Sequence, residues 1–130
     1  MGMGQVMFRT GVKVQGRPLL SLTTTGARTG KTRRAVLGWF PDEQREDCRL
    51  VVGSANGSAR HPGWAYNLAK SPDDLTVDIG DGPVPATAEL LAGPERAAAW
   101  DRVVELAPGY GRYTAKTDRE LPIFRLSPRT

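Results

Sequence analysis

The sequence predicts an antiparallel β-barrel with one or two packed helices, a mainly β (α+β) class of fold. Short strand-like runs outnumber helix-like stretches along the chain. Turn signals of hairpin length join most of these runs, which favours antiparallel pairing of neighbours. Both helix-like stretches begin at a proline, which suits a first helical turn because its nitrogen has no hydrogen to leave unpaired. A barrel is the closed arrangement that such a set of elements favours.

The first half of the chain predicts three strands. The run 19–25 is rich in threonine towards its end, and the segment 26–31 that follows contains two glycines, which is typical of a turn. A second strand is expected over 34–40, where a proline ends it. A turn over 42–47, expected to be solvated because of its four acidic residues, leads to a third strand over 49–54.

The second half predicts two helices and three more strands. A small, polar loop at 55–60 precedes a helix that begins at Pro62 and stops at the Ser-Pro pair 71–72. A second helix begins at Pro94 and ends before Pro108, with an apolar stripe along one side. Trp64 and Trp100 are expected in the core. The strands are expected at 75–79, 84–90 and 121–126, the first two joined by a hairpin turn at 80–83.

Composition narrows the class of protein further. The 130 residues fit one domain, expected over 18–130 after a loosely ordered segment 1–17. The net charge of +4 favours an anionic partner. Cys48 is the only cysteine, which excludes an intrachain disulfide framework and fits the reducing cytoplasm. No apolar run is long enough for a membrane helix, so we expect a cytoplasmic protein without stable membrane insertion.

A cationic cluster follows the first predicted strand. Its sequence, GARTGKT, is similar to a phosphate-binding loop, but it has three residues between the glycines where that motif needs four, and a strand is expected next instead of a helix. Arg28, Lys31, Arg33 and Arg34 could still bind phosphate or carboxylate groups, because arginine matches these anions with paired hydrogen bonds. Because charge is the only evidence for anion binding here, a solvated basic turn without a ligand is the alternative.

Other candidate residues have common structural explanations. His61 is the only histidine, and its place beside a helix start favours a capping or surface role over that of a catalytic base or metal ligand. Tyr110 and Tyr113 would share one face of a helix, where aromatic residues usually belong to a core. Few aromatic residues alternate with the basic ones, so we expect no nucleic-acid partner.

Three segments together resemble one family. Residues 22–33 (LTTTGARTGKTR), 54–68 (SANGSARHPGWAYNL) and 108–122 (PGYGRYTAKTDRELP) are similar, in order and spacing, to motifs of the deazaflavin (coenzyme F420)-dependent nitroreductase family. The resemblance implies a Greek-key split β-barrel of the FMN-binding split-barrel superfamily, with two or three packed helices. It also implies an oxidoreductase that transfers hydride from reduced F420 to a small electron-poor acceptor: a quinone, an enone or a nitroaromatic. FMN is the less favoured cofactor, and a non-catalytic protein that binds F420, flavin or haem is the alternative.

The resemblance also assigns site residues, without any metal ligand. Ser54, Tyr110 and Tyr113 are expected to orient the acceptor or donate a proton. The expected cofactor contacts are Ala27, Arg28, Thr29, Arg33, Arg34, Ala35, Val36, Leu37, Gly38, Val52, Gly53, Ser54, Ala55, Gly63, Trp64, Tyr66, Asn67 and Tyr110.

At three positions the sequence departs from some family members. Gly38 and Ala107 replace aromatic residues and Ala55 replaces a lysine, which predicts a wider and less polar acceptor pocket. The physiological acceptor and the oligomeric state, monomer or homodimer, stay open at this point.

Overall fold

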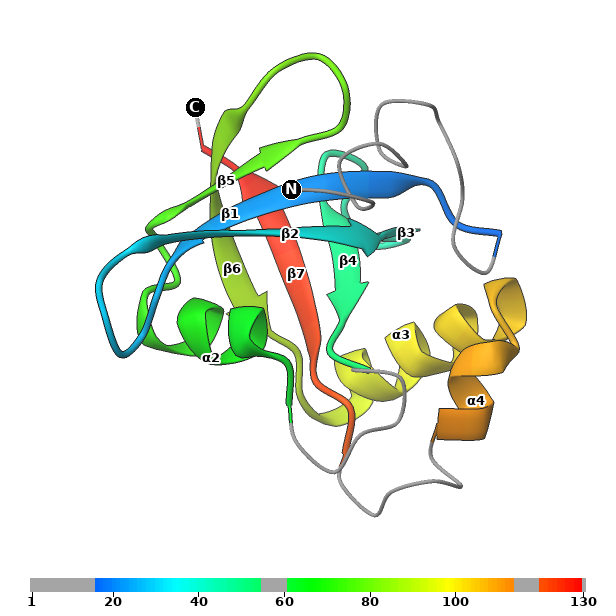
Figure 1. Ribbon diagram of the computed structural model, residues 1–130. Coiled ribbons are helices and arrows are strands. Elements are labelled where there is room, and N and C mark those ends of the chain that lie inside the picture. Colours follow the sequence, from blue (N-terminus) through cyan, green and yellow to red (C-terminus); the bar gives the residue numbers. More distant parts are fainter. Residues whose placement is uncertain (1–15, 55–60, 114–119, 130) are drawn as a thin grey trace.

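A single seven-stranded antiparallel sheet organises the computed structural model, which describes residues 16–54, 61–113 and 120–129 (Figure 1). The strand order is β2-β1-β5-β6-β7-β4-β3. The strands are β1 (Leu19–Thr25), β2 (Thr32–Gly38), β3 (Phe40–Pro41), β4 (Arg49–Val52), β5 (Leu75–Asp78), β6 (Val84–Leu90) and β7 (Ile123–Pro128). The helices are α2 (Gly63–Lys70), α3 (Gly93–Leu106) and the short α4 (Gly109–Tyr113).

The connection between β2 and β3 requires the sheet to curl. These strands occupy the two ends of the strand order, yet only Trp39 separates them in the chain. In a flat sheet they would lie about 29 Å apart, at roughly 4.8 Å per strand. Two Cα steps reach only about 7.6 Å, so the two edges must approach each other. This confirms the predicted antiparallel split barrel.

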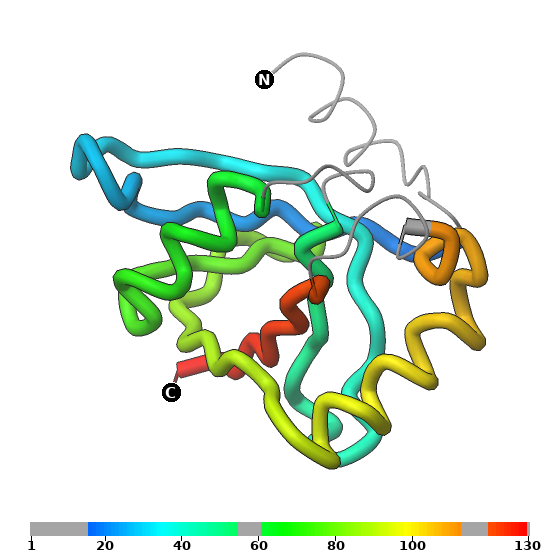
Figure 2. The backbone as a smooth tube through the Cα atoms, turned by 90° about the horizontal axis from the view of Figure 1, so that it is seen from below, coloured from blue at the N-terminus to red at the C-terminus, as the bar shows by residue number. Residues whose placement is uncertain are grey.

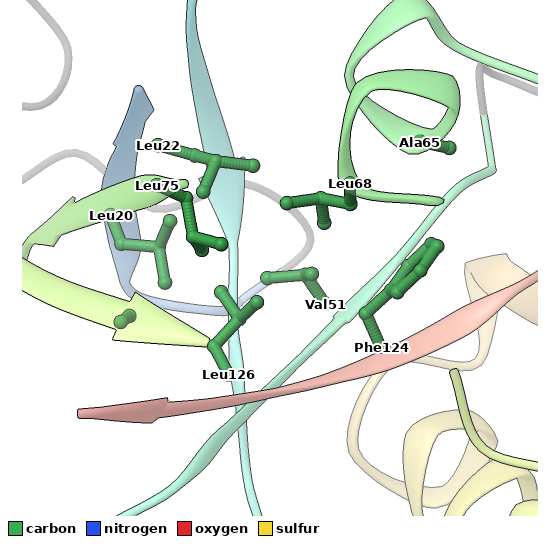
Figure 3. Packing of buried hydrophobic residues seen from close by; sticks show 9 residues of the cluster. Leu20, Leu22, Val51, Ala65, Leu68, Leu75, Phe124 and Leu126 are labelled. Carbon is green, nitrogen blue, oxygen red and sulfur yellow. The ribbon is translucent and has the colours of Figure 1, made fainter. Parts of the chain in front are cut away.

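Two apolar cores lie on the two faces of the strands that run through the centre of the molecule. The first core fills the barrel under α2, and Leu68 of that helix points into it beside Leu22 and Val51 (Figure 3). The second core packs α3 and α4 against the other face, through Leu50 and Val103 among others. Figures 1 and 2 both place α2 on one side of the barrel and α3 with α4 on the other.

Neighbouring residues of β4 and β7 belong to different cores because side chains alternate along a strand. Val51 packs in the first core, whereas Leu50 and Val52 pack in the second. Phe124 likewise packs in the first core and Ile123 in the second. The strands are therefore apolar on both faces, which explains why they appear in the sequence as short continuous apolar runs.

Both tryptophans expected in the core are only partly buried. Trp64 packs against the first core, with its ring 6.1 Å from that of Phe124 in an edge-to-face arrangement. Trp100 packs against the second core. Each tryptophan therefore packs at the edge of a core. The prediction that they contact the core was correct, but it overestimated how deeply they are buried.

Strand ends differ most from the sequence-based expectation. The expected strand 34–40 is two strands, since β2 already begins at Thr32 and Phe40 pairs with Leu50 in β3. The chain leaves one sheet edge for the other at Trp39, whose N–H donates to the carbonyl of Pro18 at 3.0 Å. The expected strand 49–54 ends at Val52, and the last strand lies two residues later than expected. Pairing partners, which no local pattern reveals, decide these ends.

One charged turn residue was wrongly expected to be solvated. Asp42 is buried and bonds to Arg125 of β7, which is itself 2% exposed. The other acidic residues of the turn are exposed as expected: Glu43, Glu46 and Asp47. Within the described ranges, no helix is both long and apolar enough to cross a membrane. The segment 1–15 and the expected loop at 55–60 lie outside the described residues.

Candidate functional site

A groove of about 770 Å³ lies between the β1–β2 turn, the start of β2 and helix α2. The turn and strand form one wall, and the first turns of the helix form the other. Its lining residues are Thr24, Gly26, Ala27, Arg28, Thr29, Arg33, Arg34, Ala35, His61, Gly63, Trp64, Tyr66 and Asn67.

The turn that forms one wall is held by its own hydrogen bonds. The N–H of Gly26 donates to the carbonyl of Lys31 at 2.7 Å, and the N–H of Gly30 donates to the carbonyl of Gly26 at 2.9 Å. Gly30 has φ of 71°, a left-handed conformation that glycine adopts without strain. The turn leads into strand β2, as expected, so it does not present a helix N-terminus as a phosphate-binding loop would.

The charge of the groove is positive. Arg28, Arg33 and Arg34 line it, and all three residues are exposed. None of the described residues that line it is acidic. Arginine stays protonated at any physiological pH and forms paired hydrogen bonds with phosphate and carboxylate oxygens. The groove can therefore hold an anion.

The helix wall adds aromatic surface. Trp64 and Tyr66 line the groove, and Tyr66 is 52% exposed. The ring of His61 packs edge-to-face on that of Tyr66, with centroids 5.8 Å apart. Aromatic rings beside guanidinium groups suit a ligand that carries both a flat ring system and negative charge.

Asn67 lies in this wall but bonds to the protein itself. Its side-chain oxygen accepts a hydrogen bond from the N–H of Ala27 at 2.8 Å, and its nitrogen donates to the hydroxyl of Thr24 at 2.9 Å. One turn further along α2, the ammonium group of Lys70 donates to the carbonyl of Ala27 at 3.0 Å. Asn67 was expected to contact a cofactor, and the structure gives its amide two bonds to the opposite wall.

Several other expected contact residues lie outside this groove. Val36, Leu37 and Gly38 are half-buried further along β2 and are not among its lining residues. Val52, Gly53 and Ser54 lie at the end of β4, where the N–H of Gly53 donates to the carbonyl of Pro122 at 2.9 Å. Ala55 lies outside the described residues.

Of the three residues expected at the acceptor, Ser54 and Tyr110 are not among the described residues that line the groove. Tyr110 is 6% exposed and packs in the second core, with its ring 5.4 Å from that of Phe40. Ser54 is half-buried at the end of β4. Tyr113 is the last residue of α4, and its side chain lies beyond what the structure describes. Ala107 is also buried in the second core. That its small size widens the acceptor pocket stays a prediction.

Three lining residues were missed by the sequence analysis: Thr24, Gly26 and His61. Thr24 is buried within a strand, and nothing in a strand pattern distinguishes a buried threonine that borders a groove. His61 was expected to have a capping or surface role. Pro62 is the N-cap of α2 and makes no side-chain capping bond, and His61 just before it lines the groove.

Comparison with known proteins agrees with this fold. The model of the F420H(2)-dependent quinone reductase family matches residues 3–128. An F420H(2)-dependent quinone reductase of Mycobacterium tuberculosis is 34% identical over 125 residues, which cover 93% of this chain and 81% of that protein. A solved structure of an F420-H2 dependent reductase (FDR-A) is 38% identical, covers 90% of this chain and 100% of its own, and has a TM-score of 0.72. A domain-swapped dimer is 35% identical, covers 95% of this chain and 92% of its own, and has a TM-score of 0.73.

The curled antiparallel sheet and the basic groove define a split-barrel protein that can hold an anionic ligand. More particularly, the chain belongs to the F420H2-dependent quinone reductase family. It is an oxidoreductase, and reduced coenzyme F420 is its cofactor. Membership in a family of reductases also favours an enzyme over the non-catalytic carrier that the sequence left as an alternative.

Proposed function

We propose that this protein reduces a small quinone with reduced F420, whose anionic part is held in the basic groove. One observation carries this proposal: three guanidinium groups line a groove in which no described lining residue is acidic. F420 carries a phosphate and a glutamyl tail, so its charge is complementary to this wall. The names of the M. tuberculosis relative and of the family favour a quinone over an enone or a nitroaromatic acceptor.

When bound, reduced F420 supplies the hydride, and the protein's task is binding, orientation and exclusion of water. Arg28, Arg33 and Arg34 neutralise the anionic groups, and Thr29 offers a hydroxyl from the same wall. Trp64 and Tyr66 cover apolar surface of the ligand from the helix wall. A quinone also needs a proton on its oxygen, and we assign Ser54, Tyr110 and Tyr113 as candidates to orient the acceptor or donate that proton.

A fluorescence titration with F420, run beside an FMN titration, tests the cofactor part of the proposal. Tight binding of F420 with weak binding of FMN supports it. If the protein binds FMN but not F420, the result would still fit a split barrel but would overturn the assignment of the groove to F420.

The acceptor is tested by following oxidation of reduced F420 at its visible absorbance band with menadione, an enone and a nitroimidazole in turn. Turnover with menadione well above the rate without protein supports a quinone. Turnover with the enone or nitroimidazole alone would reassign the acceptor.

We further propose that the protein acts in the cytoplasm, as a monomer or homodimer. Its single cysteine, Cys48, is buried and unpaired, which is typical of proteins from reducing compartments. Light scattering after size exclusion distinguishes the two oligomeric states, and a similar solved structure that is a domain-swapped dimer makes the dimer a specific alternative.

A further inference from the structure

Asn67 joins the two walls of the groove at its base. It is 8% exposed, and both ends of its amide cross from α2 to the β1–β2 hairpin, one to Ala27 and one to Thr24. The ammonium group of Lys70 donates to the carbonyl of Ala27, which is the other polar backbone group of that residue. Together Thr24, Ala27, Asn67 and Lys70 form what we call the helix–turn contact.

The hairpin does not need this contact in order to form. Strands β1 and β2 pair over their whole length, from Leu19 with Gly38 to Thr25 with Thr32. The turn is closed by its own backbone bonds between Gly26 and Lys31 and between Gly30 and Gly26. The helix–turn contact therefore sets the position of the turn relative to α2.

That position matters for the charge in the groove. Arg28 and Thr29 come directly after Ala27, so they are one and two residues from the backbone that Asn67 and Lys70 hold. The opposite wall, with Trp64 and Tyr66, is on the helix that carries Asn67. A shift of the turn would therefore change the distance between the arginine side chain and the aromatic wall.

We propose that Asn67 is a positioning residue: it fixes the separation of the two groove walls, and thereby the place of Arg28, without contacting the anionic ligand itself. This rests on the proposed function, in which the groove holds the anionic part of F420. Only an amide serves both bonds as they stand, since one end accepts from an N–H and the other donates to a hydroxyl.

The test compares F420 binding by Asn67→Leu, which keeps the size of the side chain and removes both bonds, with binding by the unaltered protein. We expect affinity about tenfold weaker, the factor that corresponds to one weakened charge-assisted hydrogen bond. Hydrogen exchange at the Ala27 N–H without ligand should become faster. Thr25→Val is the matched control, because Thr25 bonds to Asp74 at 2.6 Å outside the groove, and it should leave affinity unchanged.

A double-mutant cycle with Arg28→Ala separates positioning from direct contact. If Asn67 acts through Arg28, removing the arginine weakens binding less in Asn67→Leu than in the unaltered protein. Additive losses, or full affinity in Asn67→Leu, would overturn the inference. If that variant does not fold, Thr24→Val removes one bond of the same contact and takes its place in the cycle. Failure of the unaltered protein to bind F420 would instead refute the proposed function.

Discussion

At the scale of residues, arginines of this chain have two opposite environments. Arg125 is the largest fully buried side chain among the described residues, and it bonds to Asp42, to Glu95 at 2.7 Å and to Glu89 at 3.2 Å. Its charge is compensated within the protein. The groove arginines are exposed, and no ion pair is recorded for them among the described residues, so their charge remains available to a ligand. Sequence alone cannot separate these two kinds of arginine.

The groove arginines give the first prediction. Changing Arg28 and Arg33 together to alanine should weaken F420 binding by at least about a hundredfold, because each of the two charge-assisted hydrogen bonds contributes about 1.5–3 kcal/mol and about 1.4 kcal/mol is a factor of ten. FMN binding should weaken much less, because FMN lacks the anionic tail. Titration by fluorescence measures both. Arg45→Ala, at an exposed position outside the groove, is the control for loss of charge. Equal losses of affinity for F420 and FMN would contradict binding of the anionic tail by Arg28 and Arg33.

The buried pair gives a prediction about pH. Burial alone would raise the pKa of Asp42, but the hydrogen bond from Arg125 and those from the N–H groups of Gln44 and Arg45 hold that pKa below its usual value. A depressed pKa in the folded state means stability that is present above the unfolded pKa of about 3.9 and lost as the pH falls further. We therefore expect acid unfolding to begin near pH 4.

Asp42→Asn tests this directly by urea unfolding across a pH series. The variant should lose about 1–3 kcal/mol at pH 7, because the buried guanidinium of Arg125 loses the charge of its closest partner while Glu89 and Glu95 still pair with it, and its stability should depend less on pH below 4. Glu46→Gln, on the exposed part of the same turn, should behave like the unaltered protein. Equal pH dependence in both variants would show that Asp42 is not the group responsible.

At the scale of elements, helix ends follow local chemistry and strand ends follow partners. Helix α2 begins after Pro62 and ends before Ser71, as the prolines at 62 and 72 predict. Strand β4 ends at Val52, earlier than the expected strand 49–54, although the N–H of Gly53 still donates to the carbonyl of Pro122 beside β7. That close approach also explains the glycine, since a Cβ there would lie 2.8 Å from Cγ of Pro122.

Gly53→Ala should therefore destabilise the protein by about 1–3 kcal/mol, the usual effect of forcing extra volume into a packed site. The ring of Pro122 or the end of β4 must shift to admit the methyl group. Gly63→Ala is a matched control, because a Cβ at the start of α2 meets no atom within 4 Å. Urea unfolding compares the two, and an unchanged midpoint for Gly53→Ala would refute the tight approach.

At the scale of the whole molecule, barrel closure places the two sheet edges at β2 and β3. An edge strand pairs on one side only, so its outward N–H groups lack a ladder partner. The central strands β1, β5, β6, β7 and β4 pair on both sides. Stability should therefore differ across the sheet.

Hydrogen exchange should reveal this difference. We expect amides of β6 and β7 to exchange slowest and those of β2 to exchange faster, although β2 is as long as β1. Addition of F420 should slow exchange in β2 and in α2, which border the groove, more than in α3. Slowest exchange in β2 without ligand would contradict the strand order.

Local patterns of hydrophobicity, proline, glycine and charge were enough to predict the class of fold, the number and type of most elements, the cationic segment and the family resemblance. Three other features could be seen only in the folded chain: Arg28, Arg33 and Arg34 line a groove whose other wall is α2, Asn67 joins these walls, and Asp42 and Tyr110 are buried. These outcomes depend on which strands pair and where the sheet closes, and such long-range contacts have no local signature.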